Sequence, residues 1–545
     1  MPDWRKLPLE TGAIWRVLGY AHEAGAREVD KRLFLWLLGI LLATIASEFN
    51  DQVTSIALAD VRGGFSISRD PGTWIQSLYV SAQIVGMAVS PWMQVTFSSR
   101  RWTLFSIALC GVSSTLIPFS PNIEAIYALR LLQGLAGGLL IPVLMTTALR
   151  VFSNPKLRLY GLVFYALTAG FTAGLGASLA ALWTDLVDWR FVFFQAVPAM
   201  VLGGALVWYG ASQDEPQYER FRILDWRGVL LLIVGFGAFS TMLFQGDRLD
   251  WFNSKLICVL ALISALGIPL FLLNEWLHPL PLIKLQLLGR RNIAYGCIAL
   301  FTFLIIAQAG STVPLTYLQE IQGYRPLQAH LVTLEVALPQ LLLLPAVAYV
   351  LDFDIDPRLV SFTGLGLILV SCVGPSFVDY TWTRDQFYFW QAFQMVGQPM
   401  VTMSLLELVT NSVRGPEEAP FVSALINTPR ALSGAVAVWL LQLIARWRGN
   451  LHSDRIVDQL GQNHFELALN TASFGVPPTP TNPAGAASAD PVQALSLAVQ
   501  QQVTVLSIAD TYLVLGALTA LLMVVVVLLP VHTPPPRIAL VRRAA

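Results

Sequence analysis

The residues best able to do chemistry lie inside a long apolar stretch. Residues 33–58 read LFLWLLGILLATIASEFNDQVTSIAL, with Glu48, Asn50 and Asp51 in the second half. About 20 apolar residues suffice to cross a bilayer, and a carboxylate at the centre of such a helix costs roughly 2.5–3.5 kcal/mol. Glu48 and Asp51 are three residues apart, so they share one helix face. We therefore expect this face to line a wet transport path and to carry a proton.

The composition indicates a membrane protein that crosses the bilayer many times. Of the 545 residues, 55% are hydrophobic and 12% are charged, whereas soluble domains carry about 25% charged residues. The net charge of zero gives no nucleic-acid footprint. The four cysteines have no metal-binding spacing, the six histidines are scattered, and no GxxxxGK phosphate loop occurs. We expect no metal and no cofactor, and no ATP-driven pump within this chain.

Fourteen apolar spans are expected from the hydrophobic pattern. Their approximate ranges are 33–58, 72–97, 102–120, 123–148, 160–183, 190–210, 228–246, 256–274, 292–315, 328–351, 358–378, 386–411, 420–445 and 506–530. Pro339 and Pro345 in the tenth span and Pro399 in the twelfth predict bends, because proline removes a backbone hydrogen bond.

The distribution of Lys and Arg predicts the orientation of these spans. With the N-terminus inside, the inner segments hold 22 Lys and Arg residues and the outer segments hold 10. Positive loops stay in the cytoplasm, so both termini are expected there. Residues 1–32 then form a cytoplasmic segment, with no cleavable signal and a short amphipathic helix at 11–28.

One outer loop, 446–505, is unusually long. Its middle, FGVPPTPTNPAGAASADP, is rich in Pro and Ala, which is typical of an extended or flexible tether. Its flanks, 451–470 and 491–505, could form short helices. The loop is either a linker or a docking surface for a periplasmic partner.

Several short motifs resemble a known transporter family. They are Trp74–Tyr79, Arg130-Leu-Leu-Gln133-Gly134, Trp189-Arg190 with Pro198, Asp225-Trp-Arg-Gly228, Gly397-Gln398-Pro399, and Asn427 with Arg430. On these residues the chain resembles the major facilitator superfamily, specifically its fourteen-helix drug:proton antiporters of the EmrB/QacA type, from about residue 33 to 530.

The resemblance implies an all-α membrane protein with the major facilitator fold. Two six-helix bundles, 33–210 and 286–530, would flank a linker with two extra transmembrane helices at 211–285. The second bundle would include the outer loop 446–505, and residues 531–545 would form a cytoplasmic tail.

The chain also departs from the family pattern. The usual aspartate of the first span falls on Asn50, so the proton site is expected at Asp51 or Glu48. In the loop after the second span, Val95 replaces the usual acid. In the fifth-span antiporter motif, Ala177 replaces a proline. Because of these departures, the motifs support antiport less strongly than they support the fold.

Candidate site residues follow from the polar side chains within the spans and from these motifs. Those expected to couple protons are Glu48, Asp51, Arg130 and Glu335. Those expected to bind substrate are Asn50, Trp74, Tyr79, Gln133, Gln308, Gln391, Gln394 and Gln398. Those expected to act in gating are Arg100, Arg101, Gly170, Gly174, Gly176 and Arg430.

Arg130 and the acids of the first span are placed at similar depth, in neighbouring helices of the family's fold. A guanidinium opposite a carboxylate favours the charged acid, whereas burial favours the neutral one. A site balanced in this way could load and release a proton. Alternatively, Arg130 is a structural clasp, and which acid is protonated stays open.

The expected function is export of amphipathic toxic compounds across a bacterial inner membrane, driven by the proton gradient. Small amphipathic substrates, protons and membrane lipid are the expected partners. The resemblance adds a periplasmic adaptor of the membrane-fusion type and an outer-membrane channel. The alternatives are a dedicated exporter of a metabolite, fatty acid or siderophore, a membrane enzyme or receptor, and a non-transporting scaffold. No convergent nucleophile or cofactor motif favours an enzyme.

Overall fold

The computed structural model describes residues 31–152, 155–212, 214–353, 355–413, 415, 417–462 and 491–528. Within these ranges the chain is almost entirely helical and contains no β-strand. The helix expected at 11–28, the Pro- and Ala-rich middle of the loop and the tail at 531–545 lie outside the described residues.

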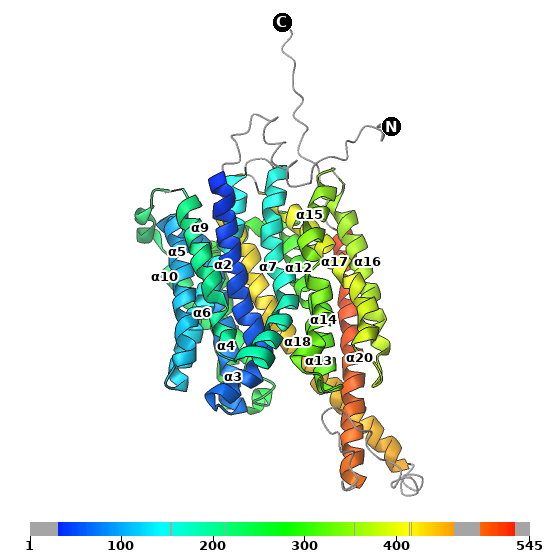
Figure 1. Cartoon of the computed structure of the whole chain (residues 1–545). Helices are drawn as coiled ribbons and strands as arrows, with labels where there is room; N and C mark the ends of the chain where they lie inside the picture. The colour runs from blue at the N-terminus through cyan, green and yellow to red at the C-terminus, as the bar shows by residue number, and fades with distance from the viewer. Residues whose placement is uncertain are drawn as a thin grey trace, which may run out of the picture.

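The helices follow one another with short connections (Figure 1). In chain order they are α2 Lys31–Ile56, α3 Leu58–Phe65, α4 Arg69–Phe97, α5 Ser99–Leu116, α6 Ile123–Val151, α7 Pro155–Ala181, α8 Phe191–Phe194, α9 Ala196–Gly210, α10 Trp226–Gln245, α11 Lys255–Leu277, α12 Arg291–Ile306, α13 Thr312–Glu320, α14 Pro326–Ala337, α15 Gln340–Leu351, α16 Pro357–Val373, α17 Arg384–Thr410, α18 Ala419–Gln462 and α20 Pro491–Leu528.

Twelve described segments are long and apolar enough to cross a membrane. Helices α4 and α17 are 29 and 27 residues long and lie among these segments. The protein is therefore a multi-span membrane protein, and its described part fits twelve to fourteen crossings. α2 begins and α20 ends on one side of the molecule, here called the terminal side (Figure 1). The opposite side is called the far side.

The helices form two groups with an added hairpin. The N-terminal bundle consists of α2 to α9, and the C-terminal bundle consists of α12 to α20. The hairpin of α10 and α11 follows the N-terminal bundle in the chain. Helix α10 packs on α4 of that bundle and also on α18 of the C-terminal bundle, so it bridges the two along one edge.

Glycines allow the closest helix contacts within each bundle. A Cβ atom on Gly134 or Gly138 of α6 would lie 2.2 Å from a backbone oxygen of α4. In the other bundle, a Cβ atom on Gly397 of α17 would lie 2.7 Å from the backbone oxygen of Gly364 in α16. Lipid tails are as apolar as leucine, so membrane helices associate through close packing of this kind rather than through the hydrophobic effect.

Two spans of the C-terminal bundle are broken near mid-length. A 3₁₀ turn at Ala307–Gly310 separates α12 from α13, and Leu338 and Pro339 separate α14 from α15. The second break coincides with the bend that Pro339 predicts. Pro399 lies inside α17, which continues as one helix. Irregular backbone at membrane depth is tolerated where it lines a protein interior.

The flanks of the outer loop predicted at 446–505 are helical, as the sequence allowed, but they continue the spanning helices instead of forming separate short ones. Helix α18 continues to Gln462, and α20 already begins at Pro491, so both project beyond the bundle on the far side (Figure 1). Arg448 Nε and His452 Nε2 each lie 2.6 Å from Asp510 Oδ2 and tie the two helices together. Loss of apolar character marks where a helix leaves the lipid, but it does not end the helix.

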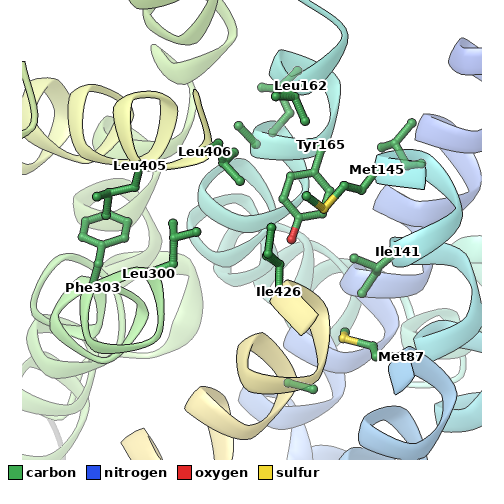
Figure 2. Packing of buried hydrophobic residues seen from close by; sticks show 14 of the residues in the cluster. Met87, Ile141, Met145, Leu162, Tyr165, Leu300, Phe303, Leu405, Leu406 and Ile426 are labelled. Atoms are coloured by element: carbon green, nitrogen blue, oxygen red, sulfur yellow. The ribbon is translucent and has the colours of Figure 1, made fainter. Parts of the chain in front are cut away.

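A continuous apolar core joins the two bundles. Figure 2 shows Leu162 and Tyr165 of α7 between side chains of both bundles. Around them lie Met87, Ile141 and Met145 of the N-terminal bundle and Leu300, Phe303, Leu405, Leu406 and Ile426 of the C-terminal bundle.

Candidate transport cavity

A cavity of about 160 Å³ lies between the two bundles. Segments of α2, α4 and α7 line one side, and the broken spans, α17 and α18 line the other. Its polar lining includes Glu48, Asp51, Gln52, Gln83, Gln308, Gln340, Gln398 and Arg430. Both bundles therefore contribute charged and amide groups to one interior space.

Glu48 faces an arginine of the opposite bundle. Glu48 Oε2 lies 3.9 Å from Arg430 Nη2, and both side chains are about nine-tenths buried. Gln83 Nε2 donates to Glu48 Oε1 at 3.4 Å. Removing an ion from water costs several kcal/mol unless a partner compensates, so this contact stabilises both charges. It also connects α2 to α18 across the cavity.

The surroundings of Arg430 come from both bundles as well. Its guanidinium carbon lies 5.1 Å from the ring centre of Tyr165 on α7, which is within range of a cation–π contact. The hydroxyl of Tyr165 donates to Asn427 Oδ1 at 2.9 Å. Arg430, predicted to act in gating, thus lies at the cavity wall beside a contact between the bundles.

Asp51 reaches Arg130 only through Gln76. Gln76 Nε2 donates to Asp51 Oδ1 at 2.6 Å, and Arg130 Nη2 donates to Gln76 Oε1 at 3.3 Å. Arg130 also donates to the Ile75 oxygen at 3.1 Å and to Gln133 Oε1 at 2.6 Å. The direct pairing expected from depth along the spans is therefore corrected. Arg130 is fully buried inside its own bundle and lies outside the cavity lining.

Of the four residues of the N-terminal bundle predicted to bind substrate, three make hydrogen bonds between helices of that bundle. Asn50 and Gln133 both donate to Ser114 Oγ, at 2.9 and 2.8 Å. The hydroxyl of Tyr79 donates to the Ser47 oxygen at 3.3 Å, and Trp74 is partly buried. None of the four predicted residues lies in the cavity lining.

The glutamines predicted in the C-terminal bundle divide into three cases. Gln308 and Gln398 line the cavity. Gln394 lies behind Gln398 and accepts a hydrogen bond from it at 3.2 Å. Gln391 is buried away from the cavity, and its Oε1 has no hydrogen-bond partner among the described residues. Their roles in substrate binding stay predictions.

Glu335 lies apart from the acids of the cavity. It lies on α14, one turn before the break at Pro339, and it is absent from the cavity lining. Its Oε2 is buried and has no hydrogen-bond partner among the described residues. The structure therefore does not bring it together with Glu48 and Asp51.

The fifth-span glycines lie at two kinds of contact. A Cβ atom on Gly170 would lie 2.0 Å from Gln340 Oε1, and one on Gly174 would lie 2.4 Å from the Thr333 oxygen. These two glycines therefore allow α7 to approach α14 and α15 of the other bundle. Gly176 instead faces Gln52 within its own bundle.

The two arginines after the second span lie away from the cavity, on the terminal side. Arg101 Nη1 donates to the Tyr218 hydroxyl at 3.1 Å, and the guanidinium of Arg100 lies 4.4 Å from the ring centre of Trp208. Both contacts connect the α4–α5 loop region to segments that follow in the chain.

Sequence reasoning missed the two glutamines that contact the acids. Gln76 and Gln83 are seven residues apart on α4, which places them on one helix face. A polar pair at this spacing within an apolar span was the available signal. Within the described residues, no group of three His, Cys, Asp or Glu could hold a metal ion.

Two bundles of membrane-spanning helices around one shared polar cavity are the architecture of a membrane transporter. The particular family is shown by sequence: the family model for the Major Facilitator Superfamily matches residues 40–438, and the chain belongs to this family.

The sequence relatives include named export proteins. The chain is 26% identical over 439 residues to the multidrug export protein EmrB of Haemophilus influenzae, covering 78% of this chain and 83% of that protein. It is 24% identical over 435 residues to EmrB of Escherichia coli K12, covering 79% and 83%. It is 26% identical over 434 residues to the fatty acid resistance protein FarB of Neisseria gonorrhoeae, covering 78% and 83%.

Solved structures support the fold. A peptide transporter of the POT family in complex with sulfate has a TM-score of 0.56 at 14% identity, covering 92% of this chain and 96% of that chain. The proton:xylose symporter XylE has a TM-score of 0.51 at 11% identity, covering 90% and 94%. At this identity the likeness concerns the fold alone.

Proposed function

We propose that this protein exports amphipathic toxic compounds across a bacterial inner membrane and that proton influx drives the export. The multidrug export proteins among its relatives support the substrate class. The acidic residues in the central cavity support proton coupling. The excess of Lys and Arg in the terminal-side segments supports a cytoplasmic location for both termini.

The observation that carries this proposal is the contact between Glu48 and Arg430. It joins the two bundles at the cavity, where a transported molecule would bind. A proton on Glu48 cancels the negative charge and weakens the attraction between the bundles. A bound substrate that contacts Glu48 competes with both the proton and Arg430. Such competition is what an exchanger requires.

Further contacts join the bundles on both sides of the cavity. On the terminal side, Ser423 Oγ donates to the Pro142 oxygen at 3.0 Å, next to the Tyr165–Asn427 contact. On the far side, Arg325 Nε lies 3.8 Å from Asp185 Oδ1. Drug-sized ligands occupy pockets of roughly 300–1,000 Å³, so the cavity of about 160 Å³ must widen when either side opens.

The energy of proton influx suffices for useful export. A charge that crosses a potential of about 100 mV gains roughly 2.3 kcal/mol. At about 1.4 kcal/mol per tenfold change, each proton supports roughly fifty-fold accumulation of substrate.

We further propose that the protein works with a periplasmic adaptor and an outer-membrane channel. The helical extension of α18 and α20 beyond the bundle on the far side is a suitable place for such a contact.

A second candidate function is dedicated export of a fatty acid. The similarity to the fatty acid resistance protein FarB favours it, as does the cationic Arg430 in the cavity, which could hold a carboxylate. Transport of matched cationic, neutral and anionic amphipaths by one preparation separates the two candidates.

The test is transport in proteoliposomes with an imposed pH gradient. Glu48→Gln is expected to abolish gradient-driven export while leaving expression and counterflow exchange of substrate intact, because the neutral amide still fills the cavity but carries no proton. Asp51→Asn alone is expected to have a smaller effect. Undiminished gradient-driven export by the double variant would refute proton coupling at these acids.

A further inference from the structure

Four polar side chains form a hydrogen-bonded row that runs from the cavity wall into the C-terminal bundle. Gln340 Nε2 donates to Gln398 Oε1 at 3.2 Å, and Gln398 Nε2 donates to Gln394 Oε1 at 3.2 Å. Gln394 Nε2 donates to Ser371 Oγ at 2.6 Å. All four side chains are more than nine-tenths buried. We call Gln340, Gln398, Gln394 and Ser371 the amide row.

Ser371, at one end of the amide row, determines the direction of the hydrogen bonds along it. Ser371 Oγ donates to the Ile368 backbone oxygen at 2.7 Å, and a carbonyl oxygen can only accept. Ser371 must therefore accept from the amino group of Gln394. Each following amide is then oriented in turn, with its oxygen toward the amino group of the next glutamine and the amino group of Gln340 toward Gln398.

This direction presents the amide oxygen of Gln340 as an acceptor at the cavity. Gln340 lines the cavity, and its Oε1 accepts no hydrogen bond from a described residue. Rotating the amide to present the amino group instead would break the bond to Gln398 and put two oxygens together. Gln340 Oε1 is open to the cavity, so a ligand there that donates a hydrogen bond can reach it, and such a bond contributes about 0.5–1.5 kcal/mol.

Gly170 leaves the space that this oxygen occupies. A Cβ atom there would lie 2.0 Å from Gln340 Oε1. The amide of Gln340 therefore extends from α15 to the surface of α7 in the opposite bundle, at the side of the cavity. Other acceptors of the lining are the carboxylates of Glu48 and Asp51 and the amide oxygens of Gln52 and Gln83.

We propose that Gln340 is a specificity-determining residue: its Oε1 selects, among amphipathic substrates, those that carry an N–H or O–H donor. The transport test of this inference rests on the proposed export function, whereas the binding test does not. The amide row acts through Gln340 by preventing the amide from rotating.

The test uses two dyes of the same charge. Proflavine has two exocyclic amines that donate hydrogen bonds, and in acridine orange both amines are dimethylated. The preference for proflavine, measured as the ratio of the two Kd values for purified protein and of the two KM values in proteoliposomes, is expected to fall about two- to tenfold in Gln340→Leu.

Two glycine variants provide matched controls. Gly170→Ala displaces the Gln340 amide, so it is expected to lower the preference as Gln340→Leu does and to have no further effect when the two are combined. In Gly174→Ala the added methyl group would meet the Thr333 backbone oxygen instead. It is expected to slow transport of both dyes equally and to leave the ratio unchanged.

The outcomes separate this inference from the proposed function. An unchanged dye preference in Gln340→Leu, with both dyes transported, overturns the inference and leaves the function intact. A preference in binding that depends on Gln340, without transport of either dye, supports the inference and overturns the function. A ratio that changes equally in Gly174→Ala would show a general packing effect and also overturn the inference.

Discussion

At the residue scale, the two acids of α2 have different partners although they are only three residues apart. Glu48 contacts Arg430 of the opposite bundle, whereas Asp51 is held by Gln76 within its own bundle. Relative movement of the bundles changes the distance from Glu48 to its cation but leaves the surroundings of Asp51 largely intact. Glu48 is therefore the better candidate for the acid whose protonation is coupled to movement.

Gln76 is predicted to stabilise the N-terminal bundle by bridging Asp51 and Arg130. Gln76→Leu leaves a buried acceptor and a buried donor without this partner, and each such loss costs about 1–3 kcal/mol. We expect a lower Tm in detergent. Gln52→Leu is the control, because Gln52 follows Asp51 in the chain and lines the cavity, but it makes no hydrogen bond to a described residue. Equal Tm values for both variants would contradict the bridging role.

At the element scale, a buried polar ladder attaches the inserted hairpin to the N-terminal bundle. Ser81 Oγ of α4 lies 2.6 Å from Ser240 Oγ of α10, and Gln245 Nε2 donates to Ser77 Oγ at 3.1 Å. Thr73 Oγ1 donates to Gln245 Oε1 at 3.1 Å. Side-chain hydrogen bonds hold helices together in lipid, so α10 should move with α4 and slide against α18.

A disulfide between α4 and α10 is expected to leave transport intact. Ser81→Cys with Ser240→Cys, in a background without the four native cysteines, places two thiols within disulfide range. Oxidation should form the bond without changing the transport rate, because both helices belong to one moving body. Loss of transport on oxidation that reverses on reduction would show that the hairpin moves relative to α4.

The loop between α10 and α11 contacts α18 through Asp250 and Arg446, which are hydrogen bonded. Hydrogen bonds from Arg446 and Asn253 hold the pKa of Asp250 below its ordinary value of 3.8. A lowered pKa means that the contact is fully present above 3.8 and is lost only as the pH falls through the lowered value.

This contact is therefore predicted to persist between about pH 5 and pH 8. Spin labels on Phe252→Cys and Trp447→Cys should report one unchanged distance over that range. Arg446→Ala is expected to broaden the distance distribution at every pH. A distance that increases as the pH falls toward 5 would contradict the assignment.

At the scale of the whole molecule, alternating access requires the contacts on the two sides of the cavity to open in turn. The Tyr165–Asn427 contact lies on the terminal side, and the Asp185–Arg325 contact lies on the far side. The structure has both contacts, with the cavity between them.

A covalent link across the terminal-side contact should stop transport. Tyr165→Cys with Asn427→Cys, bridged by a short reducible bifunctional thiol reagent, is expected to reduce transport to background and to recover on reduction. Each single variant treated with the same reagent is the control. Transport that continues at full rate in the bridged protein would exclude opening of the bundles on that side.

The helical membrane class, the positions of most spans and the break at Pro339 could be predicted from the sequence. It also identified the acids of α2, because a carboxylate within an apolar run stands out locally. These features depend on the length and composition of single segments, and lipid imposes helix on any long apolar segment.

Which side chains contact one another became clear from the packing of the helices. A helix that is apolar around most of its surface carries little information about which neighbour each face contacts. The partner of Glu48 is therefore Arg430 in the other bundle rather than Arg130, and Gln76, Gln83 and Gln340 gain their importance only from helices far away in the chain. The sequence allowed helices at both flanks of the outer loop, but that they continue α18 and α20 was not predicted, since polarity marks the limit of the lipid and not the end of a helix.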